Sequence, residues 1–340
     1  MGRIAPCRRQ APANGREVSV SRKGKLGAKA GSARAVVDPL AGLLQPGQSI
    51  ALLQELHILT REGRINQDSR RKLKQVIHLY RFIQAVLLDL LPGSGSAPDR
   101  PGLALADLGA GKSYLGFVLY DLFFRERSDG WVYGIETRAE LVQRSRALAE
   151  RLGFSRMAFV PLTVAESVSD PALPERIDLV TALHACDTAT DDAIAFGLAK
   201  SARAMVLVPC CQAELARRLN AGKALSLRHA PLAELWRHPL HTREFGSQLT
   251  NVLRCLYLEA WGYQVTVTEL VGWEHSLKNE LIIARLGGQR RRAAALRLQD
   301  LLAQFGLQGL LQDRFRLPAD LLVQAAEPGR GAADAEPPDR

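Results

Sequence analysis

The chain has 340 residues, of which 47% are hydrophobic and 24% charged, and its net charge is +10. That is enough apolar material for one large domain or two smaller ones, and no apolar run approaches the roughly 20 residues of a membrane span. Five cysteines without regular spacing do not make a disulfide framework, and the N-terminus lacks a secretory signal. We therefore expect a cytoplasmic protein with reduced thiols and no membrane partner.

The N-terminal segment is strongly basic. Residues 1–35 carry nine Lys and Arg against one acid, Glu17, among Gly, Ala, Ser and Pro. Such a composition cannot bury a core, so we expect residues 1–37 to form a disordered tail. It is either a solvated arm that binds polyanions without specificity or a transit-like leader.

Residues 38–91 show apolar residues at three-and-four spacing, which predicts a helical extension broken at Gly63. Asp68 and Ser69 are candidates to cap its second helix. The first turns of that helix carry Arg70, Arg71, Lys72 and Lys74, although positive charge there opposes the helix dipole. This cationic cluster is either a solvated face or a contact for RNA or another substrate.

A linker at 92–102 leads into alternating strands and helices, expected over 103–288. The predicted strands are 103–107, 131–136, 157–160, 177–183, 204–209, 264–271 and 280–286. This alternation predicts an α/β fold, a Rossmann-like, mostly parallel seven-stranded sheet with helices on both faces.

Three further segments follow from the pattern. The Arg- and His-rich interval 212–262 is a candidate substrate lid, because loops at the carboxyl ends of strands line the ligand crevice of such sheets. Residues 289–326 are expected to form C-terminal helices, and 327–340 a disordered tail.

The stretch "LALADLGAGKSYLG", residues 103–116, has two interpretations. Ala106 with Gly111, Lys112 and Ser113 has the spacing of a relaxed P-loop, which would predict an ATPase. Read from Asp107 with Gly109 and Gly111, it is a strand-to-helix turn that holds a nucleoside cofactor. Both place glycines and a helix N-terminus where backbone N–H groups can approach a ligand.

The following strands favour the nucleoside interpretation. A P-loop enzyme needs a later strand that ends in Asp to hold Mg²⁺, and none of the predicted strands after 103–107 does. A nucleoside crevice needs an acid at the end of the second strand to accept the ribose hydroxyls, and Glu136 stands there.

Several motifs together resemble a branch of the class I S-adenosylmethionine-dependent methyltransferases. These are "DLGAGKSYLG", "GIE", "LHACDTATDDAI" and "VPCCQAEL", preceded by the basic "RRKLKQ". The branch includes eukaryotic tRNA acceptor-stem 2′-O-methyltransferases and methyltransferase-like proteins of unsettled substrate. The resemblance covers about residues 68–286, but Ser113 replaces the third glycine, and we find no Cys/His zinc-finger module like that of the tRNA enzymes. It implies S-adenosylmethionine as the cofactor and a terminal hairpin with one antiparallel strand.

By this resemblance, six residues would bind the cofactor. The methionine part would be bound by Asp107, Gly109 and Gly111, and the ribose by Glu136. Leu162 and Thr163 would lie next to the adenine. The alternative for the glycines is an ordinary tight turn, and Thr163 has an equally plain structural alternative.

A second cluster follows the fourth and fifth predicted strands, whose ends are neighbours in a parallel sheet. Its members are His184, Cys186, Asp187, Cys210 and Cys211. Three interpretations of this cluster are open. The thiols are packing residues, or His184 or Asp187 orients or deprotonates the methyl acceptor. The third is that a thiolate adds to a pyrimidine ring, as in enzymes that methylate carbon 5 of cytosine in RNA. No metal is expected, because the paired spacing of a structural zinc site is missing.

The segment "GWEHSLKNELIIAR" joins the last two strands. His275, Lys278 and Asn279 are candidates to grip a phosphate or the acceptor, the alternative being a solvated turn. With Arg71, Lys72 and Lys74 they make up the predicted substrate-binding set. The preferred function is RNA methylation; the alternatives are methylation of a protein or small molecule, a noncatalytic nucleoside- or RNA-binding module, and a P-loop ATPase. The sequence does not fix the oligomeric state.

Overall fold

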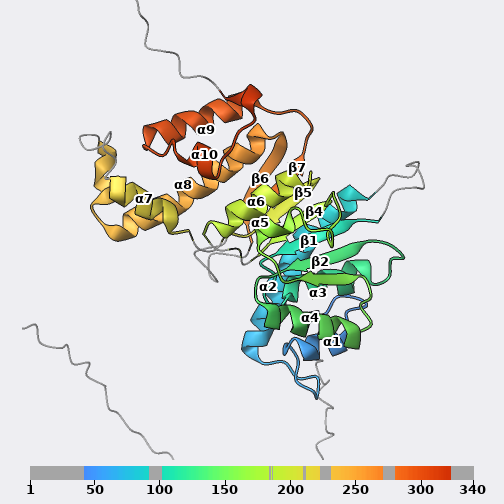
Figure 1. The fold of residues 1–340 in the computed structure, drawn as a ribbon. Coiled ribbons are helices and arrows are strands. Elements are labelled where there is room, and N and C mark those ends of the chain that lie inside the picture. Colours follow the sequence, from blue (N-terminus) through green and yellow to red (C-terminus); the bar gives the residue numbers. More distant parts are fainter. Residues whose placement is uncertain are drawn as a thin grey trace, which may run out of the picture. The chain divides into compact units, whose positions relative to one another are not determined.

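A computed structural model describes residues 42–91, 102–183, 185, 187–209, 212–222, 231–270 and 280–322. All of them belong to one compact unit, residues 39–340. At its centre lies a seven-stranded sheet in the order β3-β2-β1-β4-β5-β7-β6 (Figure 1). The strands are β1 (Ala104–Leu108), β2 (Trp131–Ile135), β3 (Met157–Val160), β4 (Leu179–Ala182), β5 (Ala204–Leu207), β6 (Tyr263–Glu269) and β7 (Glu280–Leu286).

The predicted fold is confirmed. Strands β1 to β5 are parallel, and β7 runs antiparallel between β5 and β6, as in the expected terminal hairpin. The bounds differ from the predicted ones by at most two residues, within the usual uncertainty of strand ends.

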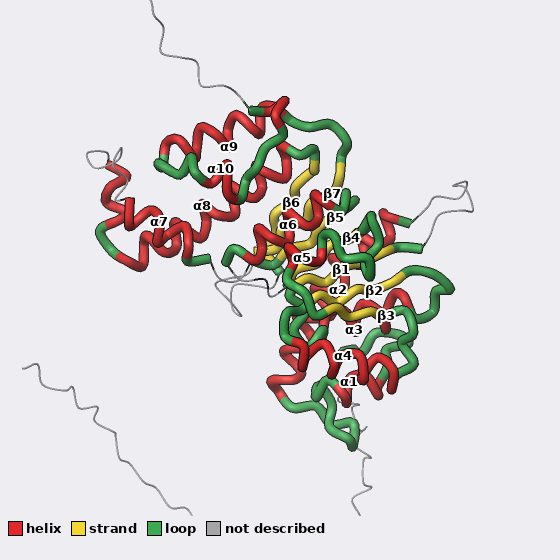
Figure 2. The backbone as a smooth tube through the Cα atoms, viewed as in Figure 1, coloured by secondary structure: helices red, strands yellow, loops and turns green. Residues whose placement is uncertain are grey.

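One face of the sheet is covered by the N-terminal helices, shown in red beside the yellow strands in Figure 2. They are α1 (Ile50–Glu55), α2 (Gln67–Leu90), α3 (Tyr114–Leu119) with its π-helical continuation η1 (Tyr120–Phe124), and α4 (Ala139–Arg151). Leu73, Ile83 and Leu87 of α2 are fully buried in the core of this face. The helical extension is therefore a structural layer of the fold.

The opposite face is covered by the later helices (Figure 1). They are α5 (Val164–Ser167), α6 (Ala189–Ala199), α7 (Glu214–Gly222), η2 (Pro231–Trp236), α8 (Pro239–Ala260), α9 (Arg292–Gln304), α10 (Leu310–Asp313) and η3 (Ala319–Leu321). Successive strand residues alternate between the two cores, as Leu179 and Val180 of β4 do.

Two details of the helices differ from, or refine, the sequence analysis. The cap of α2 is Asn66, whose side chain accepts a hydrogen bond from the Ser69 amide at 2.7 Å, so the predicted caps Asp68 and Ser69 were wrong. Both lie in the first turn because the helix begins at Gln67.

Within the interval 212–262, which was predicted as a lid, α8 contributes Leu253 and Leu258 to the core. A lid role for 212–262 stays a prediction.

Candidate active site

The glycine loop follows β1 at the carboxyl edge of the sheet. Gly109 and Gly111 have φ angles of 64° and 58°, a left-handed conformation that favours glycine. Ser113, the N-cap of α3, shares it with φ 53°, and its amide donates to the Ala110 carbonyl at 2.7 Å. The turn therefore bends back sharply before α3 and presents its backbone at the edge where such sheets bind ligands.

Glu136, the residue after β2, closes the same loop. One carboxylate oxygen accepts the Gly111 amide at 2.8 Å, and the other accepts the backbone and side-chain nitrogens of Arg138. Burial alone would raise its pKa, but the hydrogen bonds from Arg138 and Gly111 outweigh it and lower the pKa to about 2. Glu136 is thus ionised at neutral pH, as an acceptor for ribose hydroxyls must be.

Asp107 lies beneath the loop, near the end of β1. Its carboxylate accepts the Thr181 hydroxyl of β4 at 2.8 Å, and burial raises its pKa to about 7. This carboxyl group therefore carries a proton for part of the time at neutral pH, because a charge without a cationic partner is costly in the interior.

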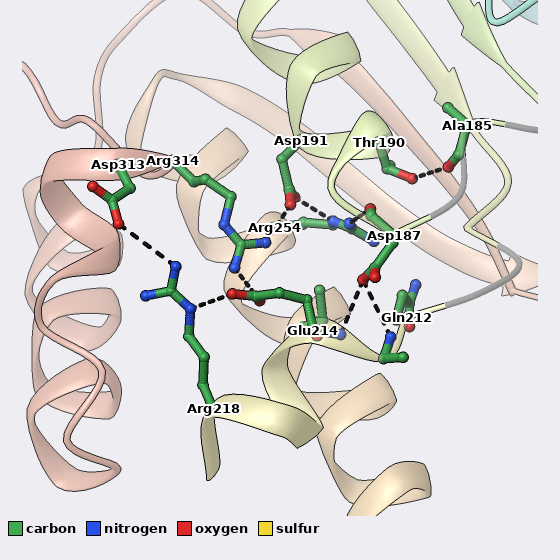
Figure 3. Close-up of polar contacts among 12 residues, drawn as sticks. Ala185, Asp187, Thr190, Asp191, Gln212, Glu214, Arg218, Arg254, Asp313 and Arg314 are labelled. Carbon is green, nitrogen blue, oxygen red and sulfur yellow. Dashed lines mark hydrogen bonds and ion pairs between the residues drawn. The ribbon is translucent and has the colours of Figure 1, made fainter. Parts of the chain in front are cut away.

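The loop is a close neighbour of the segment that leaves β4. A side-chain carbon at Gly109 would lie 3.9 Å from the Ala185 backbone, an ordinary contact. Ala185 is held in turn by the Thr190 hydroxyl, which donates to its carbonyl (Figure 3). The glycine loop and the start of the predicted acceptor cluster thus meet at one edge of the sheet.

Asp187 connects the β4 segment to α7. With a φ of 54°, it directs its carboxylate to the backbone amides of Ala213 and Glu214, each at 3.1 Å, and to Arg217. Burial would raise its pKa, but the amides of Glu214 and Ala213 and the guanidinium of Arg217 lower it. A carboxylate so occupied is a weak proton acceptor, and its predicted role in deprotonation stays a prediction.

Residues 71–218, which include the glycine loop, Glu136 and Asp187, match a family model described as a methyltransferase domain. The chain carries a methyltransferase domain. With the sheet order above, this makes the protein a class I S-adenosylmethionine-dependent methyltransferase and not a P-loop ATPase. Cofactor binding by residues 103–116 stays a prediction.

Other comparisons give weaker likenesses. A putative O-methyltransferase from Klebsiella pneumoniae is 13% identical over 73% of this chain and 94% of its own, with a TM-score of 0.41. The precorrin-6y C5,15-methyltransferase of Geobacter metallireducens is 16% identical over 61% and 88%, with a TM-score of 0.36. A putative tRNA (m1A22) methyltransferase from Streptococcus pneumoniae is 14% identical over 68% and 82%, with a TM-score of 0.34. No curated protein sequence matches this methyltransferase.

The loop fits S-adenosylmethionine. Gly109 and Gly111 leave their backbone uncovered: side-chain carbons built there would meet nothing closer than 3.9 Å. Glu136 supplies an ionised carboxylate that accepts the Gly111 amide, and Asp107 supplies a second, buried carboxyl group beneath the loop. Carboxyl groups suit a cofactor that carries an ammonium group and ribose hydroxyls. The bound cofactor supplies an activated methyl group; the residues of the chain bind and align it.

The other predicted cofactor residues lie just past β3. Leu162 is half-buried, and Thr163 caps α5 through a reciprocal pair of hydrogen bonds with Glu166. Thr163 therefore has a structural role as the cap of α5, in line with the structural alternative to cofactor binding. Contact of either residue with the adenine stays a prediction.

The basic turns of α2 lie toward the same edge as the glycine loop. The last residue of α2, Leu90, accepts a hydrogen bond from Arg203, directly before β5 and thus at the amino edge. The 24 residues of α2 span about 36 Å, roughly twice the length of a five-residue strand. Ahead of α2, Leu56 accepts the hydroxyl of Tyr114, the residue that opens α3 after the glycine loop. Arg71, Lys72 and Lys74 are exposed at this end.

Seven of the predicted site residues lie outside the described part of the chain. They are His184, Cys186, Cys210, Cys211, His275, Lys278 and Asn279. Within the described ranges, no group of three or more His, Cys, Asp or Glu could hold a metal ion, and no helix has the length and apolar character to cross a bilayer.

The sequence analysis missed the polar residues that hold the site from behind. Thr181 supports Asp107, and Arg254, buried completely, binds Asp191 and the Asp187 carbonyl. A signal existed for each: Thr181 is a lone hydroxyl in the apolar strand "LVTA", and Arg254 interrupts the apolar run "VLRCLYL". A polar residue on a buried face needs a partner, which the sequence does not name.

Proposed function

We propose that this methyltransferase acts on RNA, in the cytoplasm, with the first turns of α2 as a phosphate-binding surface. The observation that carries the proposal is the charge of residues 61–81, where seven Lys and Arg stand against two acids, Glu62 and Asp68. The basic residues are Arg61, Arg64, Arg70, Arg71, Lys72, Lys74 and Arg81.

The environment of these residues supports binding of a polyanion. Arg71 and Asp68 form an ion pair on this surface at 3.9 Å, with both side chains largely exposed. An exposed pair of that length neutralises little charge. Positive charge in the first turn also opposes the helix dipole, and a neighbouring row of phosphates would reverse that penalty.

The position of the surface supports the same proposal. A phosphate backbone bound along α2 would run toward the carboxyl edge of the sheet, where the glycine loop meets the segment after β4. Every nucleotide of an RNA carries a phosphate and atoms that can be methylated, so a basic surface next to the cofactor would fix which nucleotide is presented. The resemblance to the tRNA acceptor-stem enzymes is consistent with this class of substrate.

The test compares two pairs of exposed basic residues. Lys72→Glu/Lys74→Glu reverses charge on α2; the control, Arg291→Glu/Arg292→Glu, reverses it at the start of α9, which follows β7 at the amino edge. Binding of unmodified tRNA transcripts is measured by fluorescence anisotropy at several salt concentrations, together with transfer of labelled methyl groups.

We expect the α2 variant to weaken RNA binding tenfold or more and to flatten its salt dependence, while the α9 variant changes affinity less than about threefold. Equal losses in the two variants would mean nonspecific attraction and would contradict the proposal. So would methyl transfer to protein and none to RNA.

A further inference from the structure

Helix α8 carries a row of polar residues on a face that is otherwise packed. Ser247, Asn251 and Arg254 follow one another at spacings of four and three residues, which places them on one side of the helix. Asn251 is 4% exposed and Arg254 not at all. We call these three residues the polar row.

Arg254 holds the segment that leaves β4. Its side chain donates to the Asp187 carbonyl at 2.7 Å, to the Asp191 carboxylate at 2.6 Å and to Asn251 at 3.2 Å (Figure 3). Asp187 has a left-handed backbone and caps α7 with its carboxylate. Arg254 therefore fixes the residue at which the chain turns from β4 toward α6 and meets α7.

The rest of the row holds two other segments at the same edge. The Gln212 side chain bonds to Asn251 and Ser247 in one orientation of its amide, and to Ser247 and Arg254 in the other. Gln212 directly follows the Cys210–Cys211 pair in the sequence. Asn251 also donates to Glu280, the first residue of β7, which directly follows the predicted substrate segment "GWEHSLKN".

A second arginine links this arrangement to the end of the described chain. Arg314 pairs with Asp191 at 2.8 Å and also with Glu214 of α7, which in turn pairs with Arg218 (Figure 3). Asp191 is thus shared by two guanidinium groups. A well-packed apolar core would stabilise the fold at least as well as such buried charges, so their directional bonds set geometry more than they add stability.

We propose that the polar row of α8 positions the acceptor side of the active site by fixing three chain segments relative to one another: Asp187 after β4, Gln212 after β5 and Glu280 at the start of β7. Strand pairing fixes Glu280 together with β7; it does not fix Asp187 and Gln212, which lie beyond the ends of their strands. The inference rests on the methyltransferase activity of the site, and it holds whether the acceptor is RNA or protein.

The test uses neighbouring residues of α8. Asn251→Ala removes the bond to Glu280, the acceptor of one Arg254 bond and, in one orientation of the Gln212 amide, the bond to Gln212. Ser247→Ala is a milder second variant. The control is Thr250→Val, equally buried, whose hydroxyl bonds only to the Gly246 carbonyl of its own helix. Amide hydrogen exchange and S-adenosylmethionine binding are measured on the full chain, along with labelling of bulk RNA and bulk protein from the expression host.

We expect Asn251→Ala to speed exchange at Ala213, Glu214 and Glu280 at least fivefold, with no change at Asp107–Gly111 and less than a threefold change in cofactor affinity. The turnover number should fall at least tenfold at saturating cofactor, and Ser247→Ala should lie between Asn251→Ala and the control. Thr250→Val should resemble the unaltered protein in every measurement.

Two results would overturn the inference. One is the same exchange in Asn251→Ala and Thr250→Val; the other is faster exchange with undiminished turnover, which would leave the row a merely structural role. Labelling of protein and not of RNA would reject the proposal that RNA is the substrate. The role of the polar row would then be decided by the turnover number measured with protein as the acceptor. If neither is labelled, exchange at the three segments decides it.

Discussion

The cofactor side and the acceptor side of this active site are built in different ways. On the cofactor side, two left-handed glycines and one carboxylate make the predicted binding surface, and the bond from Gly111 to Glu136 spans 25 residues. On the acceptor side, the segments are fixed by side chains, and the pair between Arg314 and Asp191 spans 123 residues. One side is defined by local backbone conformation, the other by tertiary contacts between charged groups.

This difference predicts unequal costs of substitution. Breaking the acceptor side leaves a buried charge without all its partners, whereas breaking the cofactor side strains one turn. Substitutions on the two sides test whether their costs in stability differ, and the largest effect is expected at Arg254.

Arg254→Met should destabilise the protein most. It removes the bonds to Asp191, Asn251 and the Asp187 carbonyl, and we expect the free energy of unfolding to fall by about 3–5 kcal/mol. Arg297→Met, which breaks a partly exposed pair with Glu259, should cost at most about 1 kcal/mol. Urea unfolding followed by tryptophan fluorescence measures both, and equal losses would contradict the contrast.

The same contrast explains what the sequence reveals. The glycine loop is predictable because its conformation needs particular residues at short spacing, so Asp107, Gly109, Gly111 and Glu136 stand out in the letters alone. The inner strands β1, β4 and β5 are predictable because both of their faces are buried and their apolar runs are nearly continuous.

The acceptor side could not be predicted in the same way. Asp187 was found as a candidate, but its contacts with α7 depend on a chain reversal more than 20 residues away. Its partner Arg254, and Arg314, which binds the neighbouring Asp191, belong to no motif. The prediction of the cap of α2 was wrong for a smaller reason. Asn66, Asp68 and Ser69 are all good capping residues, and only the position where the helix begins distinguishes them.

The pH dependence of stability should separate the two carboxyl groups of the cofactor side. The folded-state pKa of Asp107, about 7, exceeds its ordinary 3.8, so the folded protein holds a proton that the unfolded chain releases. The contribution of Asp107 to stability is then fully present below about pH 4 and declines as the pH rises to 7.

Asp107→Asn should remove this decline. We expect the stability of the unaltered protein, relative to Asp107→Asn, to drop by more than about 1 kcal/mol between pH 4.5 and 7.5. Glu136→Gln should show the opposite sign, because a pKa lowered to about 2 gives stability that is present above its ordinary 4.5 and is lost toward pH 2. A flat difference for Asp107→Asn would mean that the buried carboxyl group is already ionised at pH 4.5.

The glycine turn should lose less stability on substitution than Arg254 does. Gly111→Ala places a side chain at a φ of 58° with ordinary space around it, so we expect only the strain of that conformation, about 1–2 kcal/mol. Gly153→Ala, at a φ of 68° after α4 and with nothing within 4 Å, should cost the same. Thermal unfolding compares the two variants.

Their cofactor affinities should differ. By calorimetry, Gly111→Ala should lose tenfold or more in S-adenosylmethionine binding, because the new methyl group covers backbone that the cofactor approaches, while Gly153→Ala should retain normal affinity. Equal strain with unequal binding would show that glycine at position 111 serves cofactor binding through its open backbone and does not serve stability. If both variants bind normally, Glu136 and Asp107 must hold the cofactor without close approach to the loop, and the cofactor side would then depend on side chains as much as the acceptor side does.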